Sequence, residues 1–159
     1  MAPSKGAELA LLLLGGFQLM VDEVVAGLDD RRHPGVRPVH EFALRAIDNG
    51  AETASELARR LSVSRQAAAK TIAALLEMGY VDRDADPSDG RRKRLQVTER
   101  GHEMVSIGAS LFDDVRQRWA AQIGLRQLEA LEAYLAGLVP RRVWTAEDLA
   151  SDDGDSPDY

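Results

Sequence analysis

The fold is decided by the stretch "ASELARRLSVSRQAAAKTIAALLEMGYVDRDADPSDGRRKRLQVTERG", residues 54–101, in which the apolar spacing changes period midway. Thr53 and Glu56 form a capping-box pattern, in which a hydroxyl and a carboxylate bind the free amides of a helix start. Ser64 is the expected cap of a second helix, whose apolar residues recur at three-to-four spacing up to Gly79. After Gly79, apolar and polar residues alternate, as they do in strands. The stretch therefore predicts two helices followed by two strands.

One more helix precedes this stretch. It begins at Val39 and is expected to stop at Asn49-Gly50, a pair suited to the left-handed conformations that end helices. Residues 80–83 and 93–97 are expected to pair as a β-hairpin around a turn rich in Asp, Pro and Gly. The order helix, helix, helix, strand, strand is that of a winged helix-turn-helix, in which the hairpin is the wing.

The flanking segments carry more apolar surface than a small winged helix can cover. Leu9 to Val21 is a run of thirteen residues without a charge. Because a bilayer crossing needs about 20 apolar residues, we interpret this run as a helix buried nearly all round and not as a membrane span. Two more helices with apolar stripes are expected between the Thr98 cap and Pro140. A C2 homodimer would cover these stripes; the alternative is a larger monomeric helical core.

Positive charge is concentrated in one part of an acidic chain. The 159 residues have a net charge of -6, yet residues 53–100 hold ten Lys or Arg against seven Asp or Glu, a local balance of +3. Screening confines exposed charges to about 8 to 10 Å, so the global charge is a poor guide to this region. The local excess predicts a surface for a negatively charged partner.

The outer face of the helix after Ser64 is polar but slim. It carries Arg65, Gln66 and Lys70 beside the small Ala69 and Ala73. A helix that enters the DNA major groove must approach closely and present side chains that bond base edges and phosphates. This face fits that requirement, with an ordinary solvated helix face as the alternative.

Enzymatic and metal chemistry find little support in the sequence. The chain has no cysteine, which excludes disulfides, thiolate metal sites and thiol nucleophiles. Its three histidines, His33, His40 and His102, are scattered, and no HExxH, phosphate loop or dinucleotide fingerprint is present. Gly108-Ala109-Ser110 begins like a nucleophile elbow but lacks its second glycine. We expect no enzyme, no metal site and no cofactor.

Residues 54–101 resemble the DNA-binding core of the multiple antibiotic resistance regulator (MarR) family. The wing residues at the spacing used by that family are Asp86, Pro87, Asp89, Arg91, Leu95, Thr98 and Gly101. The family brackets its winged helix with one N-terminal and two C-terminal helices that intertwine two subunits, so the resemblance covers most of residues 7–140. It implies a dimeric regulator of transcription, more often a repressor, that binds a pseudo-palindromic operator in double-stranded DNA.

The resemblance also implies roles for individual side chains. Arg91 would enter the minor groove with Asp89 orienting it. The phosphate contacts would come partly from the rest of the basic run, Arg92, Lys93 and Arg94. The major groove would receive the start of the preceding helix, Ser64, Arg65, Gln66 and Lys70.

Regulators of this kind often respond to a small aromatic or hydrophobic effector bound between the dimerisation helices and the winged helix. Phe17, His40, Phe112 and Trp119 are the candidate effector-binding residues. Aromatic residues at helical spacing also form ordinary cores, and His40 also fits a helix surface or a satisfied core histidine. The sequence leaves these alternatives open.

The predicted fold class is mainly α with a small β-hairpin, a winged helix-turn-helix flanked by dimerisation helices. Its segments are an N-terminal dimerisation helix at 7–30, the DNA-binding domain at 36–101, C-terminal dimerisation helices at 102–140, and an acidic tail, expected to be disordered, at 141–159. The function implies the bacterial cytoplasm, with nucleoid association on DNA and no membrane. The competing function is a winged helix that docks an acidic protein instead of DNA.

Overall fold

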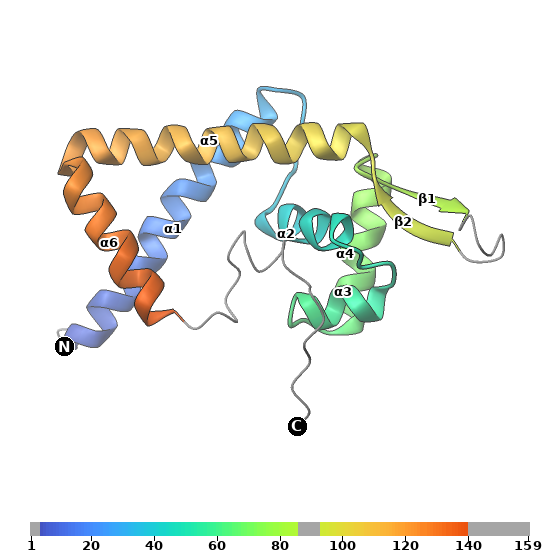
Figure 1. Ribbon diagram of the computed structural model, residues 1–159, viewed down its shortest axis with the longest axis horizontal. Helices are drawn as coiled ribbons and strands as arrows, with labels where there is room; N and C mark the ends of the chain where they lie inside the picture. Colours follow the sequence, from blue (N-terminus) through green and yellow to red (C-terminus); the bar gives the residue numbers. More distant parts are fainter. Residues whose placement is uncertain (1–3, 86–92, 140–159) are drawn as a thin grey trace.

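The computed structural model describes residues 4–85 and 93–139 as helices and one two-stranded antiparallel sheet (Figure 1). The elements are α1 (Lys5–Asp29), α2 (Pro38–Asp48), α3 (Ala54–Arg60), α4 (Arg65–Glu77), β1 (Val81–Ala85), β2 (Lys93–Val97), α5 (Glu99–Ile123) and α6 (Leu125–Leu138). The predicted fold, mainly α with a small hairpin, is confirmed. The acidic tail at 141–159 lies outside the described residues.

Two bodies share the long helix α5. In Figure 1, α5 runs along the length of the molecule; α2, α3, α4 and the hairpin gather at its beginning, while α6 folds back from its end. Helix α1 packs against α5. We call α1, α5 and α6 the arm, and α2 to α4 with β1 and β2 the winged helix.

Side-chain caps start three of the helices where the sequence predicts them. The Thr53 hydroxyl accepts from the Glu56 backbone N–H, and the Glu56 carboxylate accepts from the Thr53 N–H, each at 3.2 Å. The hydroxyls of Ser64 and Thr98 each accept from the backbone N–H three residues later, at 3.1 Å. Such caps stabilise a helix by about 1 kcal/mol each. The starts of α3, α4 and α5 are therefore fixed locally.

Tight turns connect α3, α4 and the hairpin. Ser62, between α3 and α4, has a φ of 50°, and Gly79, after α4, has a φ of 74°, which suits a residue without Cβ. The hairpin follows at once, with Val81 opposite Val97. Strand β1 extends two residues beyond the predicted range, because the pairing continues to Lys93.

The winged helix and the arm share one apolar core. Its largest fully buried apolar side chains include one from each of α2, α3, α4 and α5, and one from the turn after α4: Leu44, Leu57, Leu75, Met104 and Tyr80. Val24 and Leu28, near the end of α1, belong to the same cluster. The end of α1 is therefore anchored on the winged helix.

The expectation that the first helix is buried nearly all round is wrong within this chain. Val21, Val24 and Leu28 are its buried residues, whereas Leu12 is 69% exposed and Phe17 51% exposed. The first half of α1 projects beyond the winged helix, so burial depends on a neighbour that the single chain does not supply. Helix α1 is also longer than its charge-free run, and by length and composition it could cross a membrane.

Gly101 lies where α5 touches the start of the hairpin. A Cβ added there would overlap the Tyr80 carbonyl oxygen and the Val97 side chain. Gly101→Ala is therefore expected to destabilise the fold by about 1 to 3 kcal/mol, since a backbone atom must move to make room. Urea denaturation followed by circular dichroism measures this change.

Gly108→Ala is the matched control on the same helix. The nearest atom to its added Cβ, Glu41 Oε2, lies at 3.6 Å, an ordinary contact. Its stability should stay the same or rise by up to about 1 kcal/mol from helix propensity. Equal stabilities of the two variants would contradict the close approach at Gly101.

Candidate nucleic-acid interface

Helix α4 presents the predicted polar face to solvent. Its predicted DNA-binding residues are all exposed and lie at its start and along one side: Ser64, Arg65, Gln66 and Lys70. Ala69 and Ala73 are exposed between them, while Ala68, Ile72 and Leu75 are buried on the opposite side. The Ser64 hydroxyl also caps the helix. The structure therefore brings these donors together on a face kept narrow by alanines.

The base of the wing is tied to the turn before α3. Arg94 Nε on β2 lies 3.2 Å from Glu52 Oε1. Both side chains are partly buried, Glu52 more so than Arg94. Nothing in the spacing of Glu52 marks it as a wing partner, so sequence reasoning missed it. The pair fixes β2 against the helices, and the phosphate role of Arg94 stays a prediction.

The side chains of the other predicted wing residues lie outside the part of the chain that the structure describes. Asp89, Arg91 and Arg92 lie outside the described residues. Lys93 is placed as the first residue of β2, and its side chain is outside the description. Their roles stay predictions from the sequence.

Of the four candidate effector residues, one lines a cavity within the described residues. Phe112 lines a small cavity of about 20 Å³ between α1, α2 and α5, which also involves Arg37 and Glu41. Trp119 lies farther along the arm, where a Cβ added at Gly16 would be 3.6 Å from its ring, and the neighbouring Phe17 is exposed. The cavity has room for about one water molecule. An aromatic ligand would need it to widen.

His40 is a buried histidine with polar partners. Its Nδ1 accepts from the Arg37 backbone N–H at 3.2 Å, at the start of α2. Burial lowers its pKa, and the neighbouring Arg37 charge lowers it further. This arrangement fits the satisfied core histidine that the sequence left open.

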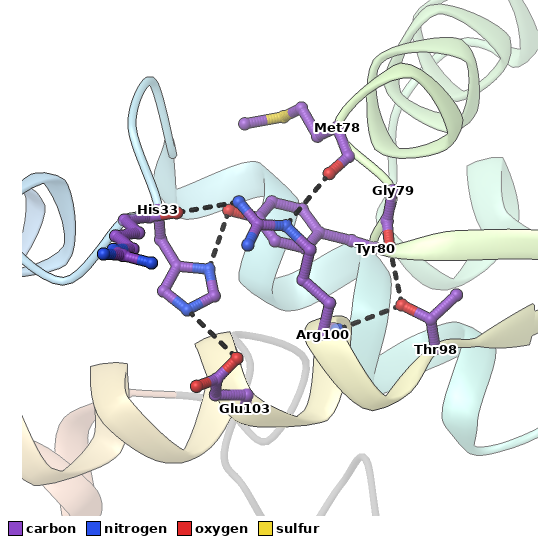
Figure 2. Close-up of polar contacts among 9 residues, drawn as sticks. His33, Met78, Gly79, Tyr80, Thr98, Arg100 and Glu103 are labelled. Carbon is purple, nitrogen blue, oxygen red and sulfur yellow. Dashed lines mark hydrogen bonds and ion pairs between the residues drawn. The ribbon is translucent and has the colours of Figure 1, made fainter.

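A polar cluster connects the arm with the winged helix, and we call it the arm joint: His33, Tyr80, Arg100 and Glu103 (Figure 2). His33 Nδ1 lies 3.1 Å from the Tyr80 hydroxyl, and its Nε2 lies 3.7 Å from Glu103 Oε2. The Arg100 guanidinium lies over the Tyr80 ring, 5.3 Å from its centroid. The cluster thus joins the α1–α2 loop, the start of the hairpin and the first turn of α5.

Arg100 also binds two backbone carbonyls of different segments. Its Nη2 donates to the Arg32 carbonyl at 2.7 Å, and its Nε donates to the Met78 carbonyl at 3.3 Å. Arg32 has a φ of 69°, a left-handed conformation that costs a residue with a Cβ about 1 to 2 kcal/mol. Arg100 therefore holds a strained loop against the end of α4.

The pKa values at the joint shift because it is buried. Burial raises the pKa of Tyr80, with Arg100 opposing that shift. Burial also lowers the pKa of His33; the Arg100 charge lowers it further and Glu103 opposes both. Sequence reasoning missed this cluster, since His33 and Tyr80 are 47 residues apart and no local pattern links them.

Metal chemistry is not indicated by the described part of the chain. Within residues 4–85 and 93–139, no group of three or more His, Asp or Glu side chains could hold a metal ion. The polar side chains gathered at the α4 face instead present hydrogen-bond donors and positive charge.

Three helices, a hairpin and an exposed polar helix face define a winged helix-turn-helix protein. Residues 35–92 match the model of the MarR family. The match covers α2, α3, α4 and β1, so this part of the chain is similar to the DNA-binding core of that family. This chain is 38% identical over 81 residues to two HTH-type transcriptional regulators, one of Mycobacterium bovis and one of Mycobacterium tuberculosis. The aligned residues are 50% of this chain and 54% of each relative. The chain thus spans about half the length of these curated relatives.

Solved structures share the fold. The S. aureus MepR–DNA complex aligns with a TM-score of 0.61 and 18% identity, over 83% of this chain and 96% of that one. YusO from Bacillus subtilis aligns with a TM-score of 0.62 and 19% identity, over 86% of this chain and 97% of that one. A MarR family protein of Mycobacterium tuberculosis aligns with a TM-score of 0.59 and 24% identity, over 87% of this chain and 98% of that one. These likenesses extend beyond the winged helix to the arm.

Tyr80→Phe removes the hydroxyl that contacts His33 and keeps the ring. We expect a loss of about 1 to 2 kcal/mol in the free energy of unfolding, since a buried imidazole nitrogen loses its partner. Chemical denaturation measures it. A Tyr80→Phe variant as stable as the wild type would show that the hydroxyl contributes nothing to stability.

Proposed function

We propose that this chain is a dimeric, sequence-specific DNA-binding regulator of transcription that represses its targets and is released from its operator by a small-molecule effector. The observation that carries the proposal is the outer face of α4, where Arg65, Gln66 and Lys70 are exposed beside small alanines. Such a face can approach base edges in the major groove while its cations contact phosphates. The existence of a MepR–DNA complex with the same fold supports it.

The arm supports self-association. Leucines on the first half of α1 and apolar residues of α6 are exposed together: Leu9, Leu11, Leu12, Leu13, Leu14, Leu131, Tyr134 and Leu138. Exposed apolar surface of this extent is typical of a protein interface. A twofold dimer would place two recognition helices about 34 to 36 Å apart, which requires a pseudo-palindromic operator.

The effector site is proposed at the cavity lined by Phe112. It lies between the arm and α2, so a ligand that widens it would alter how the winged helix sits on the arm. A ligand that binds the DNA-free conformation better weakens DNA binding by the same coupling energy. Such a regulator acts in the cytoplasm and associates with the nucleoid when bound to DNA.

Fluorescence anisotropy with duplexes from around the coding region tests DNA binding. Lys70→Gln is expected to lower affinity and to reduce the slope of log affinity against log salt by about 1, since one phosphate contact is lost. Lys5→Gln is the same change at an exposed residue at the start of α1 and should alter neither. Equal affinities and equal salt slopes of the two variants would contradict the assignment of α4 as the DNA-binding helix. Absence of any sequence preference in the wild type would favour protein docking instead.

Sedimentation velocity tests the dimer. Leu12→Gln is expected to weaken self-association by about tenfold or more, because a polar amide is buried where an apolar side chain packs. Val63→Gln, on an exposed apolar residue of the winged helix, is the control and should self-associate as the wild type does. A wild type that stays monomeric at every concentration would contradict the dimer. Cosedimentation of that monomer with lipid vesicles would assign α1 to a membrane.

A further inference from the structure

The arm joint contains a histidine that the proposed function does not use. His33 is 1% exposed, yet it lies in the loop that connects the arm to the winged helix (Figure 2). A buried ionisable group at such a connection changes the cost of keeping the connection closed when it gains a proton. This makes it a candidate for regulation.

We propose that His33 is a proton-sensitive positioning residue, which keeps the winged helix fixed on the arm while neutral and loosens it when protonated. The part of the proposal that concerns DNA rests on the proposed function above. A dimer reaches both half-sites with full affinity only when each winged helix keeps a fixed position on its arm. Acidification should therefore weaken DNA binding.

The neutral imidazole suits both of its polar neighbours. With its proton on Nε2, His33 accepts from the Tyr80 hydroxyl at Nδ1 and directs its N–H toward Glu103. Protonation places a hydrogen on Nδ1 as well, so the imidazole can no longer accept from Tyr80. The Tyr80 hydroxyl would then have to rotate and accept from Nδ1, and its own hydrogen would give up the His33 acceptor in a fully buried site.

The charges around His33 oppose protonation on balance. Arg100 on α5, which bridges the Arg32 and Met78 carbonyls, repels a second cation. Glu103, also on α5, attracts it, but its side chain is 61% exposed and lies 3.7 Å away. Asp29, at the end of α1, accepts from the Gly35 N–H. Tyr80 stays neutral because burial raises its pKa.

The direction of the pH effect follows from the lowered pKa of His33. A histidine with a lower pKa in the closed joint than in an open one favours the closed joint fully above its ordinary value of 6.5. This preference is lost as the pH falls below 6.5 toward the lowered value. The joint should therefore be closed at neutral pH and open progressively in mild acid.

The first test is hydrogen exchange of the full chain at about pH 7.5 and about pH 5.5, corrected for the intrinsic effect of pH on exchange. Wild type is expected to lose protection in acid in the loop at residues 28–35 and in the first turns of α5. His33→Asn keeps an acceptor for Tyr80 but cannot be protonated, so it should keep that protection. An acid loss identical in wild type and His33→Asn would overturn the proposal.

Two comparisons separate His33 from the other histidines. His102→Asn changes a half-exposed histidine of α5 that lies next to Glu103 in the sequence and 3.7 Å from Asp48. This variant should lose protection in acid as the wild type does. Opening caused by His40 would appear at residues 37–44, at the start of α2, and not in the loop. If His102→Asn abolishes the acid effect while His33→Asn retains it, the sensor is not His33.

The second test measures affinity for a selected duplex over the same pH range at constant ionic strength. Wild-type affinity is expected to fall by about fivefold in acid, the low end of typical coupling between two sites, and His33→Asn should show little change. Failure of the chain to bind DNA at any pH would reject the proposed function and leave the exchange result standing. DNA binding with the same pH dependence in both proteins would reject the role of His33 alone.

Discussion

The first turn of α5 lies directly on the start of the hairpin, and the placement of α4 depends on this contact. Gly101 allows the approach, Thr98 binds the Gly79 carbonyl at 2.7 Å, and Arg100 covers the Tyr80 ring. Because Tyr80 is fully buried among residues of α4 and α5, the same contact orients both the wing and the outer face of α4. The arm and the winged helix are thus joined by a shared core and a polar joint.

The surface divides into two kinds. The winged helix exposes cations and small side chains around α4, whereas the arm exposes leucines on α1 and apolar residues on α6. An acidic chain with a local basic excess avoids indiscriminate attraction to nucleic acid while keeping charge where contact is needed. The two proposed partners, a duplex and a second copy of the chain, differ in chemistry in the same way as these two surfaces.

Local features of the fold could be predicted from the sequence, because short-range rules govern them. The Thr53, Ser64 and Thr98 caps and the change of period after Gly79 lie within a few residues of the structure they define. The exposure of α1 could not be predicted, since burial depends on which neighbour reaches a helix. Long-range pairs such as Glu52 with Arg94 and His33 with Tyr80 leave no periodic signal. For the same reason, the sequence could indicate that the polar face of α4 is exposed but could not indicate the arm joint.

Hydroxyl-radical footprinting on a duplex from beside the coding region tests the central claim most directly, because it reports the number and spacing of the contacts. The account predicts two protected patches on one face of the duplex, related by an approximate twofold axis, with half-site centres about 10 base pairs apart or a multiple of that spacing. A single patch, or uniform weak protection on every fragment, would contradict a dimer that places two α4 helices on an operator.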